Sequence, residues 1–172
     1  MLAEHGKHRV LLLETDLYDP SQLRQLGLSS WAGLVECLQG ECPPLAALRR
    51  IEPLSCYLLP AGGLASNPTE LLDSERFSPL VKELAAHFDW ILMDSPPSNP
   101  VADVLALKAQ ADGCLLVVRA ARTPREALEE SVRQLGRENV LGVVLNGIEG
   151  LDRRYSGYYG KYYTGGGPKG RR

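Results

Sequence analysis

The sequence contains no long hydrophobic run, no closely paired cysteine motif and no cluster of histidines. No apolar stretch approaches the roughly 18 to 20 residues that span a membrane, and no signal-peptide hydrophobic region precedes the charged N-terminal segment. The four cysteines, Cys37, Cys42, Cys56 and Cys114, form no C-x-x-C pair and lack the histidines that would complete a zinc site. We therefore expect a cytoplasmic protein whose thiols are reduced and mostly buried.

The net charge of -2 hides an uneven distribution of charge along the 172 residues. Residues 152–172 hold six basic residues and one acid, which leaves 13 basic and 20 acidic residues in the rest of the chain. A basic tail can contact phosphates, an anionic surface or the acidic body of a neighbouring copy. Charge alone favours the simpler interpretation of a solvated tail, and we expect no nucleic-acid partner.

Hydrophobic runs without polar alternation recur along the chain and are separated by segments with helical spacing. The expected strands are residues 10–13, 57–59, 90–93, 114–118 and 140–145, and the expected helices are residues 31–38, 45–49, 68–72, 75–87, 102–109 and 125–135. Continuous apolar strands suit a parallel sheet covered on both faces, and the alternation of strand and helix is typical of a doubly wound α/β fold. We expect this domain to occupy residues 1–150 and a flexible basic tail, rich in tyrosine and glycine, to occupy residues 151–172.

One expected strand ends in an acid, because Asp94 follows residues 90–93 directly. An acid at the carboxyl end of a central strand lies at the ligand crevice of nucleotide enzymes, where it can hold Mg²⁺ through water. Asp94 is therefore a candidate Walker B acid. A turn-initiating aspartate before Ser-Pro-Pro explains the pattern equally well.

A second expected strand, residues 10–13, leads into Glu14 and Asp16. Residues two apart in an extended segment project to the same side. Both carboxylates could then converge on one metal ion or on one attacking hydroxyl.

Together these two strands resemble the Walker A-prime and Walker B strands of bacterial tyrosine kinases, which regulate capsule and exopolysaccharide synthesis on a P-loop ATPase fold. The similarity continues, in order, through Leu59-Pro60-Ala61-Gly62, Asn67-Pro68-Thr69-Glu70, Val101-Ala102-Asp103, Ala111-Asp112-Gly113 and Leu141-Gly142-Val143-Val144-Leu145-Asn146. The resemblance implies ATP and Mg²⁺ as cofactors. It implies that Asp94 and Glu14 hold Mg²⁺ through water, that Asp16 helps to activate a tyrosine hydroxyl, and that Asn146 contacts adenine. An asparagine before Gly147 also suits a turn.

The tail holds five of the seven tyrosines, separated by Ser, Gly and Lys: Tyr155, Tyr158, Tyr159, Tyr162 and Tyr163. In the family that the chain resembles, such a cluster implies autophosphorylation sites that enter the active site of a neighbouring copy. An adhesive low-complexity segment is the alternative. The resemblance also implies a membrane-embedded polysaccharide co-polymerase or activator as partner, with recruitment to the inner face of the plasma membrane.

The sequence departs from the family pattern at two places. It contains no G-x-x-x-x-G-K-[S/T] loop, which binds the β and γ phosphates in P-loop enzymes, so we expect a P-loop-type fold that lacks the first strand and the P-loop. The family's Asp-x-Asp-x-Arg reads Glu14-Thr15-Asp16-Leu17-Tyr18 here, so a tyrosine replaces a cation.

Three functions remain open on these residues. The first is a protein-tyrosine autokinase, of which this chain is an incomplete piece with weak or no activity. The second is a natural, non-catalytic relative that acts as a phosphorylatable interaction module, and the third is a partitioning-type ATPase, which leaves the tyrosine cluster unexplained. Loss of a central strand would expose unpaired strand edges, so we also expect dimerisation or aggregation.

Overall fold

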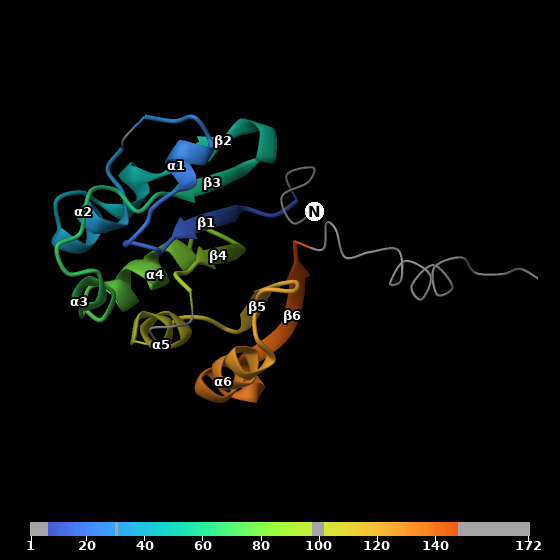
Figure 1. The fold of residues 1–172 in the computed structure, drawn as a ribbon. Coiled ribbons are helices and arrows are strands. Elements are labelled where there is room, and N and C mark those ends of the chain that lie inside the picture. The colour runs from blue at the N-terminus through green and yellow to red at the C-terminus, as the bar shows by residue number, and fades with distance from the viewer. Residues whose placement is uncertain (1–6, 30, 98–101, 148–172) are drawn as a thin grey trace, which may run out of the picture. The chain divides into compact units, whose positions relative to one another are not determined.

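The computed structural model describes residues 7–29, 31–97 and 102–147, which form two compact units that divide after Asp112 (Figure 1). The expected boundary at residue 150 and the whole of the tail, residues 151–172, lie outside the described residues. None of the described helices is long and apolar enough to cross a membrane.

The first unit is built on a four-stranded sheet with the strand order β2-β3-β1-β4. Strand β1 (Val10–Glu14) pairs in parallel with β3 (Cys56–Leu59) on one side and with β4 (Trp90–Asp94) on the other. Strand β2 (Arg49–Ile51) is antiparallel to β3. The three parallel strands are the three apolar runs that the sequence predicts in this part of the chain, so the mostly parallel sheet is confirmed.

The helices of the first unit cover one face of this sheet more fully than the other. They are α1 (Gln22–Gln25), α2 (Leu34–Gln39), η2 (Pro44–Ala47), η3 (Glu52–Leu54), α3 (Pro68–Leu72), α4 (Phe77–Ala85) and α5 (Ala102–Lys108). Leu11, Leu13 and Leu59 pack against α2 and α4 in a large core, whereas the opposite face holds a smaller cluster around Val10 and Leu58. The apolar stripe of α4 explains its position, since its four buried residues recur at steps of three and four.

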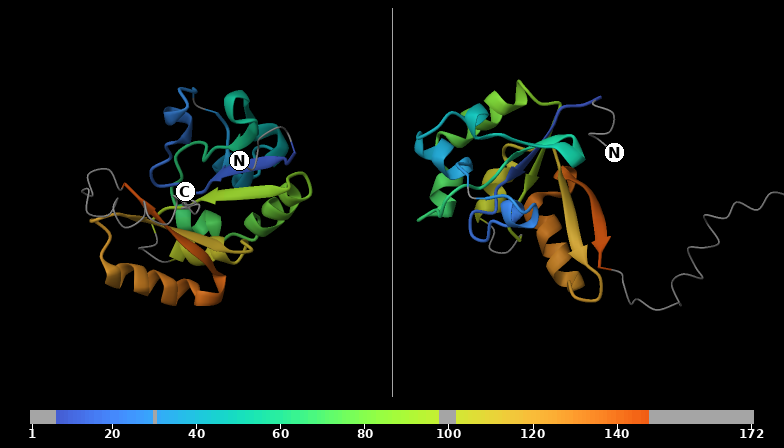
Figure 2. Two further views of the ribbon diagram at one scale, coloured as in Figure 1. Left: turned by 90° about the vertical axis from the view of Figure 1, so that its right-hand side faces the viewer. Right: turned by 90° about the horizontal axis from the view of Figure 1, so that it is seen from above.

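The described part of the second unit, residues 113–147, contains two strands and one long helix. Strands β5 (Cys114–Arg119) and β6 (Val140–Asn146) pair in parallel, and α6 (Arg125–Leu135) and the short η4 (Arg137–Asn139) connect them. Figure 2 shows β5 and β6 side by side with α6 running alongside them. This β-α-β order is the parallel crossover that the sequence predicts.

The expected helix at residues 45–49 is wrong at its C-terminal end. The chain makes the 3₁₀ turn η2 and then enters β2 at Arg49, whose guanidinium carbon lies 3.4 Å from the centre of the Trp31 ring. Pairing with β3 and stacking on Trp31 both favour an extended Arg49. Helix α1 was also not expected from the sequence.

Candidate functional site

Strands β1 and β4 end together, which brings the predicted acids to one edge of the sheet, here called the carboxyl edge. Glu14 lies opposite Asp94 in the strand register. The backbone N–H and the hydroxyl of Thr15 both donate to the Asp94 carbonyl oxygen, at 2.9 and 2.7 Å. These bonds extend the pairing one residue past the strands, so the segment leading to Asp16 is held beside Asp94. In parallel sheets, ligands bind at this edge.

The carboxylate of Glu14 is buried and is occupied by backbone amides. Its side chain is only 2% exposed. One oxygen accepts hydrogen bonds from the N–H groups of Ser21 and Gln22, both at 2.7 Å, and the other accepts from Ala61 at 2.9 Å. Three such bonds satisfy a buried carboxylate without a cation. This geometry favours a positioning role for Glu14 over the metal-binding role that the sequence suggests.

Asp16 shapes the loop that follows β1. Its Oδ1 accepts hydrogen bonds from the backbone N–H groups of Tyr18 at 3.1 Å and Asp19 at 3.2 Å, which is an Asx turn. Tyr18, which stands where the family has a cation, is exposed and shares a 2.8 Å hydrogen bond between its hydroxyl and that of Thr69. The half-buried Asp16 therefore keeps a fixed backbone while remaining in contact with solvent.

Asp94 is exposed, and a side chain from α1 holds it. The amide nitrogen of Gln22 donates a short hydrogen bond to Asp94 Oδ2. Since the backbone N–H of Gln22 also donates to Glu14, this residue connects the two acids. The sequence gives no sign of this role, because a lone glutamine in a four-residue helix forms no pattern.

A second carboxylate fixes the 60–63 loop, which follows β3 and supplies the Ala61 amide. Glu36 on α2 accepts hydrogen bonds from Gly33 at 2.7 Å and from Gly63 at 2.9 Å. Partial burial raises the pKa of Glu36, but the backbone hydrogen bonds outweigh it and hold that pKa below its usual range. Gly33 is required here, because a Cβ would lie 2.1 Å from the Pro60 carbonyl oxygen.

Asn146, Asp103 and the tail tyrosines belong to other segments of the chain than the two strands of the carboxyl edge. Asn146 ends β6 in the second unit, is exposed, and accepts a 2.8 Å hydrogen bond from the Gly147 N–H through its side-chain oxygen. Asp103 in the first turn of α5 is 3% exposed, and its Oδ1 has no hydrogen-bond partner among the residues described. The five tail tyrosines lie outside the described ranges.

The carboxyl edge suits Mg²⁺ that is shared with a nucleotide. Within the described part of the chain, no group of three or more His, Cys, Asp or Glu side chains is placed to hold a metal ion. Mg²⁺ is usually bound by one or two carboxylates together with water and substrate phosphates, so the exposed carboxylate of Asp94 is a fitting donor. The loop motif that cradles those phosphates is not present in the 172 residues.

Comparison with known proteins identifies relatives along most of the chain, although no family model matches it. The chain is 30% identical to the tyrosine-protein kinase YwqD of Bacillus subtilis over 162 residues, which cover 93% of this chain and 68% of YwqD. It is 32% identical over 158 residues to the tyrosine-protein kinase Wzc of Salmonella typhimurium, covering 90% of this chain. It is also 32% identical over 180 residues to the succinoglycan biosynthesis transport protein ExoP of Rhizobium meliloti, covering 95% of this chain. The chain spans only 22% of Wzc and 23% of ExoP.

The solved structures that are similar to this chain also include a kinase domain. The kinase domain of VpsO superposes with a TM-score of 0.77 at 32% identity, covering 81% of this chain and 70% of that domain. The septum site-determining protein MinD of Pyrococcus horikoshii, solved with Mg-ADP, has a TM-score of 0.68 at 19% identity, covering 86% of this chain and 60% of MinD, and this likeness shows only a shared fold. The fold is thus of the P-loop NTPase type. Because the identity to YwqD reaches 30% and extends over 68% of that kinase, the chain belongs to the family of bacterial tyrosine kinases.

Proposed function

We propose that the chain is the metal-binding, adenine-binding and phosphoacceptor part of an ATP-dependent protein-tyrosine autokinase that regulates polysaccharide synthesis or export. The observation that carries the proposal is the pairing of Glu14 with Asp94 and of Thr15 with the Asp94 carbonyl, which brings Asp16 to the same carboxyl edge as Asp94 in a chain with 30% identity to a tyrosine-protein kinase. The printed name of ExoP, a succinoglycan biosynthesis transport protein, supports the link to polysaccharides.

In this proposal each acid of the carboxyl edge has a distinct role. Asp94 supplies an oxygen for Mg²⁺ through water, and Asp16 accepts the proton of the tyrosine hydroxyl. As that oxygen bonds to the γ-phosphorus of ATP, the bond from the phosphorus to the departing ADP oxygen breaks. Mg²⁺ neutralises the charge of the phosphates when it is bound. Glu14 contributes by fixing the loops at Ser21 and Ala61.

Asn146 and the tail complete the proposed function. The Asn146 side-chain oxygen already accepts the Gly147 N–H, so its amide nitrogen is the group we assign to adenine. The tail tyrosines are the proposed phosphoacceptors, and their basic surroundings suit entry into the acidic edge of a neighbouring copy: Tyr155, Tyr158, Tyr159, Tyr162 and Tyr163. We place the protein in the cytoplasm with a membrane-embedded polysaccharide co-polymerase or activator as partner.

The function is tested by incubating the full chain with radiolabelled ATP and Mg²⁺. We expect very weak incorporation by the chain alone, because none of its residues forms the phosphate-binding loop. The D94N variant should abolish the remaining incorporation and the D89N variant should retain it, since Asp89 precedes the opposite end of β4. Strong incorporation by the chain alone, or activity that D94N leaves unchanged, would contradict the proposal.

The second candidate is a non-catalytic module that an intact kinase phosphorylates, since the 172 residues contain no phosphate-binding loop motif. Adding full-length YwqD to the same mixture distinguishes the two. A chain that is labelled on its tail only after YwqD is added is a phosphoacceptor module. Replacing the five tail tyrosines with phenylalanine should remove that label, and a label that persists would place the acceptor elsewhere.

A further inference from the structure

Two of the four cysteines lie side by side at the end of α2. The helix ends at Gly40, which has a φ of 83°, in the left-handed region that favours glycine. The Gly40 N–H donates to the Cys37 carbonyl and the Glu41 N–H donates to the Glu36 carbonyl, at 3.1 and 2.8 Å. This turn reverses the chain and places the Cys42 sulfur 3.3 Å from that of Cys37. Both thiols are free.

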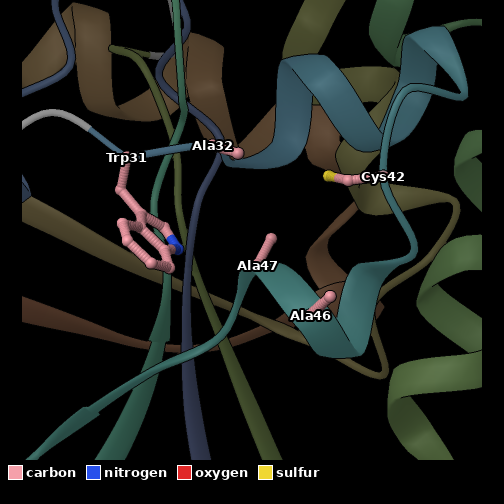
Figure 3. Close-up of a pocket in the computed structure, with 5 residues that line it drawn as sticks. All are labelled: Trp31, Ala32, Cys42, Ala46 and Ala47. Carbon is pink, nitrogen blue, oxygen red and sulfur yellow. The ribbon is translucent and has the colours of Figure 1, made fainter.

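The two thiols differ in access to solvent. Cys37 is 8% exposed and belongs to the main core. Cys42 is half-buried and lines a pocket of about 310 Å³ together with Trp31, Ala32, Ala46 and Ala47. Figure 3 shows the Cys42 sulfur directed toward the interior of this pocket. A small molecule that enters the pocket therefore meets Cys42 first.

The surroundings of the two thiols also indicate that Cys42 is the more reactive one. Burial, followed by the hydrogen bond and charge of the neighbouring Cys42, raises the pKa of the Cys37 thiol to about 12. Cys37 is therefore held in its protonated form inside the core, whereas Cys42 is only half-buried. The thiolate is the reactive form of cysteine, so the accessible Cys42 is the better nucleophile.

We propose that Cys37 and Cys42 form a reversible intramolecular disulfide, with hydrogen peroxide as the oxidant and Cys42 as the thiol that reacts first. The Cys42 sulfur attacks one peroxide oxygen, the O–O bond breaks, and a sulfenic acid and one water form. The Cys37 sulfur then attacks the Cys42 sulfur, the S–O bond breaks, and a second water leaves with the Cys37 proton. From their 3.3 Å separation, the sulfurs need only a small approach to reach the bond length of about 2.05 Å.

The disulfide would link the end of α2 to the turn that follows it, and so would affect what α2 holds in place. Glu36, next to Cys37 on that helix, holds Gly33 and the 60–63 loop. Oxidation therefore acts on the element that fixes this loop, without touching Asp16 or Asp94. The inference does not depend on kinase activity.

Trypsin makes the proposal directly testable, because it cleaves after Lys and Arg. Residues 25–49 contain no Lys or Arg before Arg49, so Cys37 and Cys42 share one tryptic peptide, whereas Cys56 and Cys114 lie on two others. The reduced chain is treated with equimolar hydrogen peroxide, then denatured, alkylated with iodoacetamide and digested. We expect the 25–49 peptide to lose two hydrogen atoms and carry no alkyl group, and the Cys56 and Cys114 peptides to be alkylated fully. Dithiothreitol should restore alkylation.

Two variants test the order of reaction. In C37S, Cys42 has no thiol partner, so the sulfenic acid should persist and be trapped by dimedone. In C42S, Cys37 should remain unmodified under the same conditions because it is buried. Full alkylation of both cysteines after peroxide treatment, or dimedone labelling of Cys37 in C42S, would overturn the proposal.

Discussion

Glu14 and Asp94 lie opposite each other in neighbouring strands, yet their carboxylates meet different surroundings. Glu14 is buried and accepts three backbone hydrogen bonds, whereas Asp94 is exposed and contacts the Gln22 amide. A carboxylate that is enclosed by N–H groups is already neutralised by dipoles and has little need of a cation. An exposed carboxylate can share its oxygens with Mg²⁺ and water.

The E14Q variant tests whether the Glu14 carboxylate stabilises the fold or serves as a metal-binding group. A glutamine turns an NH₂ group toward backbone N–H donors, so at least one of the three hydrogen bonds is lost inside the protein. We expect the free energy of unfolding to fall by about 2 to 4 kcal/mol. Urea unfolding followed by circular dichroism measures this change, with E70Q on the exposed Glu70 as a control that should change stability by about 0.5 kcal/mol or less. A neutral or stabilising E14Q would indicate a repulsive, metal-seeking carboxylate instead.

Sequence reasoning located Asp16 and Asp94 but not the environment of Glu14. An acid after an apolar run reveals the end of a strand, and parallel strands end at one edge, so these positions could be predicted. The donors to Glu14 come from loops at residues 21, 22 and 61, whose positions depend on the packing of the whole unit. Local periodicity carries no information about such contacts.

At the scale of elements, an ion pair ties the start of β1 to the start of β4. The Arg9 side chain lies 2.9 Å from Asp89 Oδ1, and the Arg9 backbone N–H donates to Oδ2 at 2.7 Å. The side-chain and backbone hydrogen bonds from Arg9 lower the pKa of Asp89 to about 2. The pair thus joins the two strands at the ends opposite the carboxyl edge.

This lowered pKa predicts a pH dependence of stability. Because an unfolded aspartate has a pKa of about 3.9, the charged Asp89 stabilises the fold fully above about pH 4. That contribution is lost as the pH falls through about 2, where the folded carboxyl takes up its proton. The difference in unfolding free energy between the natural chain and D89N should therefore be constant near pH 7 and shrink between about pH 4 and pH 2. A difference that is independent of pH would show that the ion pair does not contribute.

The strands that are continuous apolar runs could be predicted from the sequence, whereas β2 could not. Residues 49–51 read Arg-Arg-Ile, which is too short and too charged to be recognised as a strand. Its extended form depends on pairing with β3 and on the stacking of Arg49 over Trp31. Both are tertiary contacts, which local helix propensity does not include. Propensity at residues 45–49 therefore favours a longer helix than the chain forms.

At the scale of the whole molecule, β4 is an edge strand of the four-stranded sheet. Trp90 and Leu92 lie opposite Val10 and Leu12 and are 47% and 43% exposed. An edge strand with exposed apolar side chains is a template for pairing with another chain. Strand β4 is therefore a candidate surface for the expected self-association of this 172-residue chain.

Lysine substitutions on this strand test the self-association. We expect the natural chain to gain mass with rising concentration, measured by light scattering after size-exclusion chromatography. Variants W90K and L92K should shift that rise to several-fold higher concentration, because lysine blocks edge pairing. L64K is the matched control, since Leu64 is 91% exposed but belongs to no strand. A sharply melting monomer at every concentration would contradict this expectation.

The proposed metal site is tested most directly by a titration with Mn²⁺, a paramagnetic substitute for Mg²⁺. Binding is followed by nuclear magnetic resonance of the backbone amides. Paramagnetic broadening detects weak binding and locates it along the chain, whether or not phosphate is transferred. We expect the amides of Asp16, Leu17 and Ser95 to broaden first, D94N to abolish this broadening, and D89N to retain it. Broadening that is absent from the carboxyl edge, or that survives in D94N, would contradict the assignment of Asp94 as the metal-binding acid.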